Sequence, residues 1–236
     1  MKMTMRISLL TLLTLILFSI PTQSSAQVDE SQYGAWYMYF WNTDFKESKF
    51  GLQGDVQYRN WDLGGDLEQL LLRGGVTYQP ENTDLLLTLG YGHITTGTFG
   101  DSDAKTTESR IYQEALLPGQ IGQRIFLKHR FRYEQRFVEN QDFRTRYRYN
   151  LFVNIPFNQA NLDQGAVYLA LYNELFINGE RSIGEGQSVE LFDRNRSYAA
   201  LGYSVKNNLK VQFGVMRQIT DNISKNQLQL SLHHSF

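Results

Sequence analysis

The chain ends with Leu228-Gln229-Leu230-Ser231-Leu232-His233-His234-Ser235-Phe236, a stretch in which two kinds of side chain alternate. Leucines, one histidine and the final phenylalanine occupy every second position, and glutamine, serine and the other histidine lie between them. Because successive side chains of a β-strand point to opposite sides, the stretch predicts a strand with one apolar and one polar face. Such a strand suits the wall of a transmembrane β-barrel, which has lipid on one side and a polar interior on the other.

The same two-residue period recurs along the whole chain, in segments separated by clusters of Asn, Asp, Gly and Pro that reverse its direction. Each segment is long enough to cross a membrane when tilted. The eleven segments are 33–42, 49–60, 67–79, 84–95, 107–117, 123–138, 143–156, 165–177, 190–205, 208–219 and 226–236. Because single-chain bacterial barrels have an even number of strands, we expect an all-β protein with one antiparallel transmembrane β-barrel of about 12 strands, or 10 as the second choice.

The amino-terminal residues predict a secretion signal. Cationic residues precede an apolar stretch at 7–20, and small residues then lead to Ala26. The apolar stretch is shorter than the roughly 20 residues that a membrane-spanning helix needs, which favours a cleaved signal over a transmembrane helix. We therefore expect residues 1–26 to be a signal peptide and residues 27–236 to form one barrel domain.

The composition favours a barrel in the cell outer membrane. Aromatic residues make up 14% of the chain and only four prolines occur, which suits long strands and membrane interfaces. The mean hydropathy of −0.40 is compatible with a membrane barrel, because its alternating faces cancel in an average. The net charge of −1 gives no reason to expect nucleic acid binding, and the lack of cysteine excludes disulfides and a cysteine-linked lipid anchor.

The carboxyl terminus and the two longest polar stretches predict how the barrel is oriented. Phe236 is similar to the terminal aromatic signal that the bacterial barrel-assembly machinery reads, so we expect this machinery and outer-membrane lipid as partners of a monomer. If the carboxyl end lies in the periplasm, the polar stretches 96–106 and 178–188 become loops outside the cell.

Arginine alternates with aromatic residues in two adjacent segments, 123–138 and 143–156, which we expect to form a hairpin that turns at 139–142. A lipid-facing arginine near the middle of a membrane costs about 2–4 kcal/mol, so these arginines are expected to point into the barrel. There they need carboxylate partners, which arginine binds through two parallel hydrogen bonds. The predicted interior ladder consists of Glu108, Arg110, Glu114, Arg130, Arg132, Glu134, Arg136, Arg144, Arg146, Arg148, Glu174 and Arg196. The ladder either fills the interior with ion pairs or forms an anion-attracting pore or binding site.

Some outer-membrane barrels are enzymes, among them phospholipases, lipid A deacylases and omptin-type proteases, and they need a histidine with serine or aspartate partners. The four histidines here, His93, His129, His233 and His234, lie in no recognisable nucleophile motif. We expect His129 and His234 to face lipid or the interface and His233 to face inward. No residue spacing is typical of a zinc or calcium site, and no glycine pair precedes a helix. We therefore expect no catalytic residue, no cofactor and no metal.

Several motifs together resemble a family of Gram-negative outer-membrane barrels, the domain-of-unknown-function 2490 family. The motifs are Tyr58-Arg59, Leu71-Leu72-Arg73, Glu108-Ser109-Arg110, Arg130-Phe131-Arg132-Tyr133-Glu134-Gln135-Arg136, Arg146-Tyr147-Arg148, Asn173-Glu174-Leu175-Phe176 and Asn195-Arg196. Asp193-Arg194 departs from the pattern, which puts the role of Arg194 in doubt. The resemblance implies a barrel and its location, and it implies no activity, substrate or catalytic residue.

The sequence leaves three classes of function open. The first is an outer-membrane barrel whose charged interior is a narrow channel, or which has a structural or binding role in the envelope. The second is a soluble periplasmic barrel that binds a small ligand, although alternating apolar faces would give it an apolar exterior. The third is a barrel enzyme that hydrolyses lipid or peptide. A fold alone does not distinguish these classes.

Overall fold

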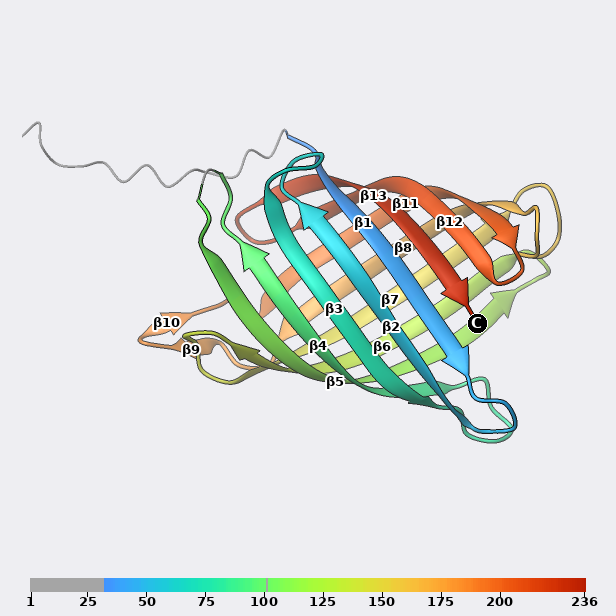
Figure 1. Ribbon diagram of the computed structural model, residues 1–236, viewed down its shortest axis with the longest axis horizontal. Coiled ribbons are helices and arrows are strands. Elements are labelled where there is room, and N and C mark those ends of the chain that lie inside the picture. Colours follow the sequence, from blue (N-terminus) through green and yellow to red (C-terminus); the bar gives the residue numbers. More distant parts are fainter. Residues whose placement is uncertain (1–31, 101) are drawn as a thin grey trace, which may run out of the picture.

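The structure, a computed structural model, describes residues 32–100 and 102–236 of the 236-residue chain (Figure 1). The predicted signal peptide, residues 1–26, lies outside the described residues. Within the part that is described, no helix has the length and apolar character needed to cross a membrane.

All the long strands of the described chain belong to one closed barrel, so the expected all-β barrel is confirmed (Figure 1). A short hairpin, β9 (Ser182–Gly184) with β10 (Gln187–Ser188), projects from the connection between two of these strands. The barrel strands are β1 (Gly34–Asp44), β2 (Phe50–Asn60), β3 (Leu67–Tyr78), β4 (Leu86–Gly97), β5 (Lys105–Ile121), β6 (Ile125–Val138), β7 (Arg144–Pro156), β8 (Val167–Asn178), β11 (Phe192–Lys206), β12 (Leu209–Ile219) and β13 (Ser224–Ser235). Each overlaps one of the segments in which the sequence alternates.

The expectation of about 12 antiparallel strands is wrong in number and in one pairing. The described residues form an eleven-stranded barrel, in which β1 pairs parallel with β13, from Gly34 opposite Gln227 to Asn42 opposite Ser235. Every other neighbouring pair in the barrel is antiparallel. When consecutive strands reverse direction each time, the first and the eleventh run the same way, so an odd barrel can close only through a parallel pair.

The chain consequently enters and leaves the barrel at opposite ends. We call the end at which the chain terminates the Phe236 end, and the end that carries β9 and β10 the hairpin end (Figure 1). Gly34 begins β1 at the hairpin end. The two long polar connections, from β4 to β5 and from β8 to β11, also lie at the hairpin end, away from Phe236.

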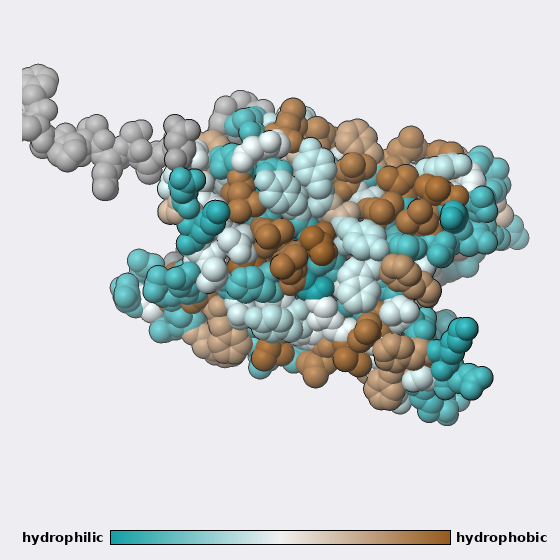
Figure 2. Space-filling model, in the orientation of Figure 1, coloured by the Kyte–Doolittle hydropathy of each residue, from teal (hydrophilic) through white to brown (hydrophobic). Residues whose placement is uncertain are grey.

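The outer wall of the barrel is apolar. Side chains that point outward include Leu89 and Leu201, both 60% exposed, and Phe213, which is 57% exposed. Figure 2 shows apolar and aromatic side chains over the middle of the wall and hydrophilic side chains gathered toward the two ends. Among the outward positions of β12, only Arg217 is charged, and it lies near the hairpin end, where it donates to Ser224. This is the alternation that the sequence predicted.

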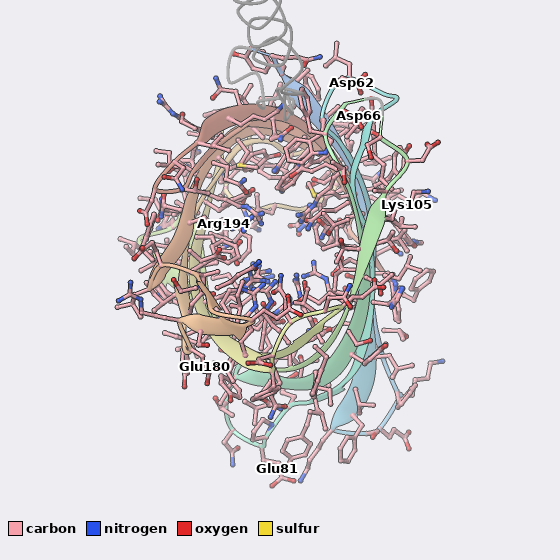
Figure 3. All side chains as sticks on the ribbon, turned by 90° about the vertical axis from the view of Figure 1, so that its left-hand side faces the viewer. Asp62, Asp66, Glu81, Lys105, Glu180 and Arg194 are labelled. Carbon is pink, nitrogen blue, oxygen red and sulfur yellow. The ribbon has the colours of Figure 1, made fainter. Side chains whose placement is uncertain are left out.

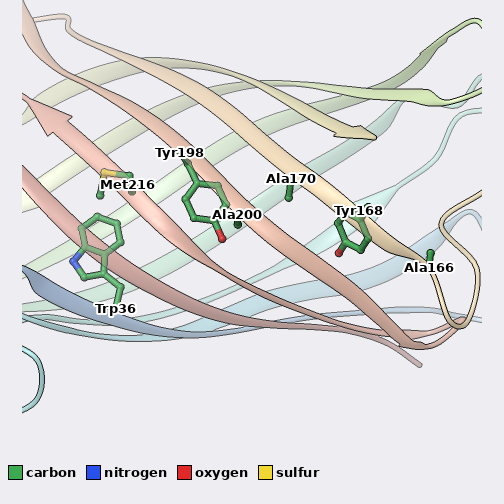
Figure 4. Packing of buried hydrophobic residues seen from close by; sticks show 7 residues of the cluster. All are labelled: Trp36, Ala166, Tyr168, Ala170, Tyr198, Ala200 and Met216. Atoms are coloured by element: carbon green, nitrogen blue, oxygen red, sulfur yellow. The ribbon is translucent and has the colours of Figure 1, made fainter. Parts of the chain in front are cut away.

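The inner wall has an apolar part and a charged part. Buried apolar side chains cluster on β1, β8, β11 and β12 (Figure 4). One of them, the Tyr168 ring, lies over Gly202 of the neighbouring strand, where a Cβ atom would overlap it. The apolar cluster consists of Trp36, Ala166, Tyr168, Ala170, Tyr198, Ala200 and Met216. The charged part is centred on β5 to β8, has further residues on β2, β3 and β11, and is described next.

Candidate functional site

The predicted interior ladder lies on the inner wall. β5 carries three of its residues, β6 four, β7 three, and β8 and β11 one each. All are buried except Arg130, whose side chain is 15% exposed. β6 and β7 form the predicted hairpin and place Arg132 opposite Arg148 and Glu134 opposite Arg146. Two-residue alternation on neighbouring strands thus brings charges that are distant in sequence onto one surface.

Glu134 is the centre of this surface. Its carboxylate is 1% exposed and accepts from Arg146 Nη2 at 2.6 Å and from Arg148 Nη1 at 2.5 Å. Arg132 and Arg110 lie farther away, with nitrogen–oxygen distances of 3.8 and 4.0 Å. A buried carboxylate is stable in its charged form only with such partners. Glu134 therefore balances the charge of arginines from three strands.

The remaining ladder carboxylates extend the network along the wall. Glu174 accepts from Arg130 at 2.7 Å and from Arg148 at 2.5 Å. Glu108 accepts from Arg110 and Arg136, each at 2.6 Å. Glu114 pairs with Arg132. The ion pairs run continuously from β5 to β8, and Arg144 stands out because it has no carboxylate within 4.0 Å among the described residues.

Several interior charges were missing from the predicted ladder. Asp55 and Arg73 form a buried pair at 2.9 Å on β2 and β3, and Arg59 lies on the same face of β2 as Asp55. The period of two in β2 gave a signal for Asp55 and Arg59, since both alternate with outward apolar residues.

Two other missed residues, Glu68 and Asp193, lie at β-bulges. In the pairing of β2 with β3, Arg59 faces Gln69 and Asn60 faces Leu67, so Glu68 is an extra residue. In the pairing of β8 with β11, Asp193 is skipped in the same way. A bulge inserts one residue and re-aims its side chain, which breaks the period of two. Glu68 accepts from Trp36 Nε1 at 2.8 Å, and Asp193 accepts from Arg146 at 2.9 Å and from Arg194 at 3.1 Å.

Two cavities in the barrel interior, both lined by described residues, border the ladder. The wide cavity has a volume of about 790 Å³ and reaches the Phe236 end, where Asn42, Asn207 and Ser235 line it. The narrow cavity has a volume of about 40 Å³ and lies among the arginines. Four arginines line both cavities and so lie where the two meet: Arg59, Arg73, Arg148 and Arg196. Figure 3, a view along the barrel from the hairpin end, shows side-chain nitrogen atoms gathered around a central gap.

The histidines lie apart from this charged surface. His233 lines the wide cavity and is hydrogen-bonded to Ser231 at 3.0 Å. His129 is hydrogen-bonded to Tyr149, at 2.8 Å, and His234 to Tyr39, at 3.1 Å. His93 is exposed on β4. Each partner is a hydroxyl group.

One family model matches the chain, over residues 33–229, and its description is protein of unknown function (DUF2490). The matched region includes ten of the barrel strands completely and half of β13. No curated protein and no solved structure matches the chain.

Proposed function

Because the chain belongs to the DUF2490 family, as its motifs predicted, and this family has no assigned function, we propose a role from the geometry: an outer-membrane β-barrel whose charged interior is a narrow, anion-preferring channel. The observation that carries the proposal is the contrast between the two sides of one wall. Large apolar side chains point outward, and buried guanidinium and carboxylate groups point inward. That arrangement suits a barrel with lipid outside and a polar interior.

The outer wall supports the membrane location. A soluble protein with this many large apolar side chains facing water would expose a surface prone to association. Closure leaves no unpaired strand edge in the barrel, which favours a monomer in contact with outer-membrane lipid. Phe236, which is 70% exposed, remains accessible as the recognition signal for the barrel-assembly machinery during insertion.

The interior charge supports the anion preference. Arginines outnumber carboxylates on the inner wall, and an excess of positive charge in a confined space attracts anions and repels cations. The arginines are Arg59, Arg73, Arg110, Arg130, Arg132, Arg136, Arg144, Arg146, Arg148, Arg194 and Arg196. The carboxylates are Asp55, Glu68, Glu108, Glu114, Glu134, Glu174 and Asp193.

Membrane fractionation with gel mobility before and after heating tests the location. A folded barrel in the outer-membrane fraction that migrates differently after boiling is the expected result.

Reconstitution in planar bilayers then tests the channel. We expect small single-channel steps and, under a salt gradient, a reversal potential of the sign that anion selectivity gives. Arg196→Gln should reduce the selectivity, whereas the outward-facing control Arg217→Gln should not. Inserted protein without conductance would leave only a structural role in the envelope.

A soluble periplasmic ligand-binding barrel is the second candidate. The observation that favours it is the wide cavity of about 790 Å³, which is large enough for a small organic ligand. Aromatic side chains such as Trp36, Tyr172 and Tyr198 line it. This candidate predicts that the mature protein remains in the aqueous fraction without detergent.

A further inference from the structure

The narrow cavity has an unusual wall. Eight of the eleven residues that line it are arginines, and the other three are Gln69, Leu71 and Phe176. None of the carboxylates of the ion-pair network is among the residues that line the cavity. A space bounded by so many cations and no anion has a strongly positive potential.

Two of these arginines, Arg59 and Arg196, are in contact with no carboxylate of the described chain. Each is 5% exposed, and within the described chain neither forms an ion pair at 4.0 Å or less. Their guanidinium groups donate instead to neutral glutamine oxygens. Arg59 donates to Gln57 at 2.6 Å and to Gln69 at 2.9 Å, and Arg196 donates to Gln218 at 2.8 Å. These bonds satisfy donors without neutralising the charge, and a buried charge without a counter-ion is unfavourable.

Trp36 holds both guanidinium groups in place. The central carbon atom of Arg59 lies 3.8 Å from the centre of the Trp36 ring, and that of Arg196 lies 4.8 Å from it. The ring itself is fixed, because its Nε1 donates to Glu68 at 2.8 Å. A desolvated cation over an aromatic face is stabilised by the ring, which favours this position of the guanidinium groups.

We propose that the narrow cavity is a binding site for a phosphate-class oxyanion, held by Arg59 and Arg196 among the other arginines. A tetrahedral dianion has several oxygen atoms that accept from different guanidinium forks at once, whereas a carboxylate has two oxygen atoms and chloride offers no fork geometry. A cavity needs a volume of about 10–15 Å³ to hold a single water molecule. The narrow cavity, with about 40 Å³, therefore admits a compact anion of a few heavy atoms.

Because of the wide cavity, the bound phosphate group can also be part of a larger solute. The wide cavity meets the narrow cavity at Arg59 and Arg196, and its volume of about 790 Å³ can hold the organic part of a phosphorylated solute. The shared feature is the phosphate group in the arginine-walled cavity. Binding depends neither on the membrane location nor on conduction, so the site is testable even if the proposed channel function fails.

The test is a calorimetric titration of the folded full-length mature chain in detergent with sodium phosphate at constant ionic strength. Saturable binding is the expected result. Arg59→Gln and Arg196→Gln should each weaken it by at least about tenfold, because each removes a charge-assisted contact. Arg217→Gln, an arginine on the outer wall, should leave the affinity unchanged. Absence of saturable phosphate binding to the wild type, or wild-type affinity in Arg59→Gln and Arg196→Gln, would overturn the proposal.

Two further measurements keep the result interpretable. Because no carboxylate of the described chain lies within 4.0 Å of Arg59 or Arg196, neither replacement leaves behind the unpaired partner of a direct ion pair, and both variants should unfold in phosphate-free buffer at the same temperature as the wild type or higher. Phosphate should raise the unfolding temperature of the wild type and not that of the variants, and an equal rise in all three proteins would contradict the site. Titration with glucose 6-phosphate separates the sources: tighter binding than inorganic phosphate assigns the site to a phosphorylated solute, and equal or weaker binding assigns it to the free ion.

Discussion

Replacing Glu134 by glutamine should destabilise the barrel more than any exposed charge replacement. The change keeps the size of the side chain and removes its charge, which balances Arg146 and Arg148 at 2.6 and 2.5 Å. At an effective dielectric constant of about 20, two unit charges about 4 Å apart attract each other by about 4 kcal/mol. Part of this lost attraction is offset, because burying a neutral glutamine costs less desolvation energy than burying the Glu134 carboxylate. We therefore expect the free energy of unfolding to fall by about 3–5 kcal/mol, as when one partner of a buried ion pair is removed.

Glu190→Gln is the matched control. Glu190 pairs with Arg181 at 3.0 Å, but the two side chains are 62% and 61% exposed, so its loss should cost at most about 1 kcal/mol. Urea unfolding in one detergent, followed by tryptophan fluorescence and extrapolated linearly, gives both values. Added salt should change the stability of the wild type little, because buried pairs are poorly screened. If Glu134→Gln and Glu190→Gln destabilise the barrel equally, Glu134 is not the counter-ion of the buried arginines.

Two further predictions concern packing and a buried hydrogen bond. Gly202→Ala should lower the free energy of unfolding by about 1–3 kcal/mol, because the new methyl group overlaps the Tyr168 ring. Gly74→Ala is the control: its Cβ position is open space, so the free energy of unfolding should change by less than about 0.5 kcal/mol in the same urea assay. Trp36→Phe removes the indole Nε1–H that donates to Glu68 at 2.8 Å, and should lower the free energy of unfolding by about 1–3 kcal/mol beyond the effect of lost packing. A variant as stable as the wild type would contradict this role of the indole.

Alternation predicted the barrel strands because it depends only on which side chains share a face. Each of the eleven segments overlaps a barrel strand, and the inward position of Arg132 or Arg146 follows from the cost of placing arginine in lipid. The error in strand number came from a general rule, the even number of strands in bacterial barrels, and not from the residues themselves. A parallel closing pair between β1 and β13 is a contact between the two ends of the chain, and no local pattern specifies it.

The partners of the interior charges were harder to predict than their direction. Glu134 meets Arg148 because the β6–β7 turn sets the register, and a shift by one residue would reverse which side chains face inward. Glu68 and Asp193 were missed for a different reason. Each is the extra residue of a bulge, so its neighbours in sequence predict the wrong side of the wall. Both bulges place a carboxylate inside, where Trp36 or an arginine donates to it.

Hydrogen bonding and charge balance are separate requirements: one part of the inner wall satisfies both, and another part satisfies hydrogen bonding alone. On β5 to β8, carboxylates such as Glu134 supply acceptors and negative charge together, so arginines such as Arg146 and Arg148 are both bonded and neutralised. Around Arg59 and Arg196 the acceptors are glutamines, which fix the guanidinium groups and leave their charge in place. If rigidity alone were needed, carboxylates at these positions would provide the same geometry with stronger bonds. The use of neutral acceptors where the two cavities meet therefore favours a site that keeps its positive charge for an anion from solution.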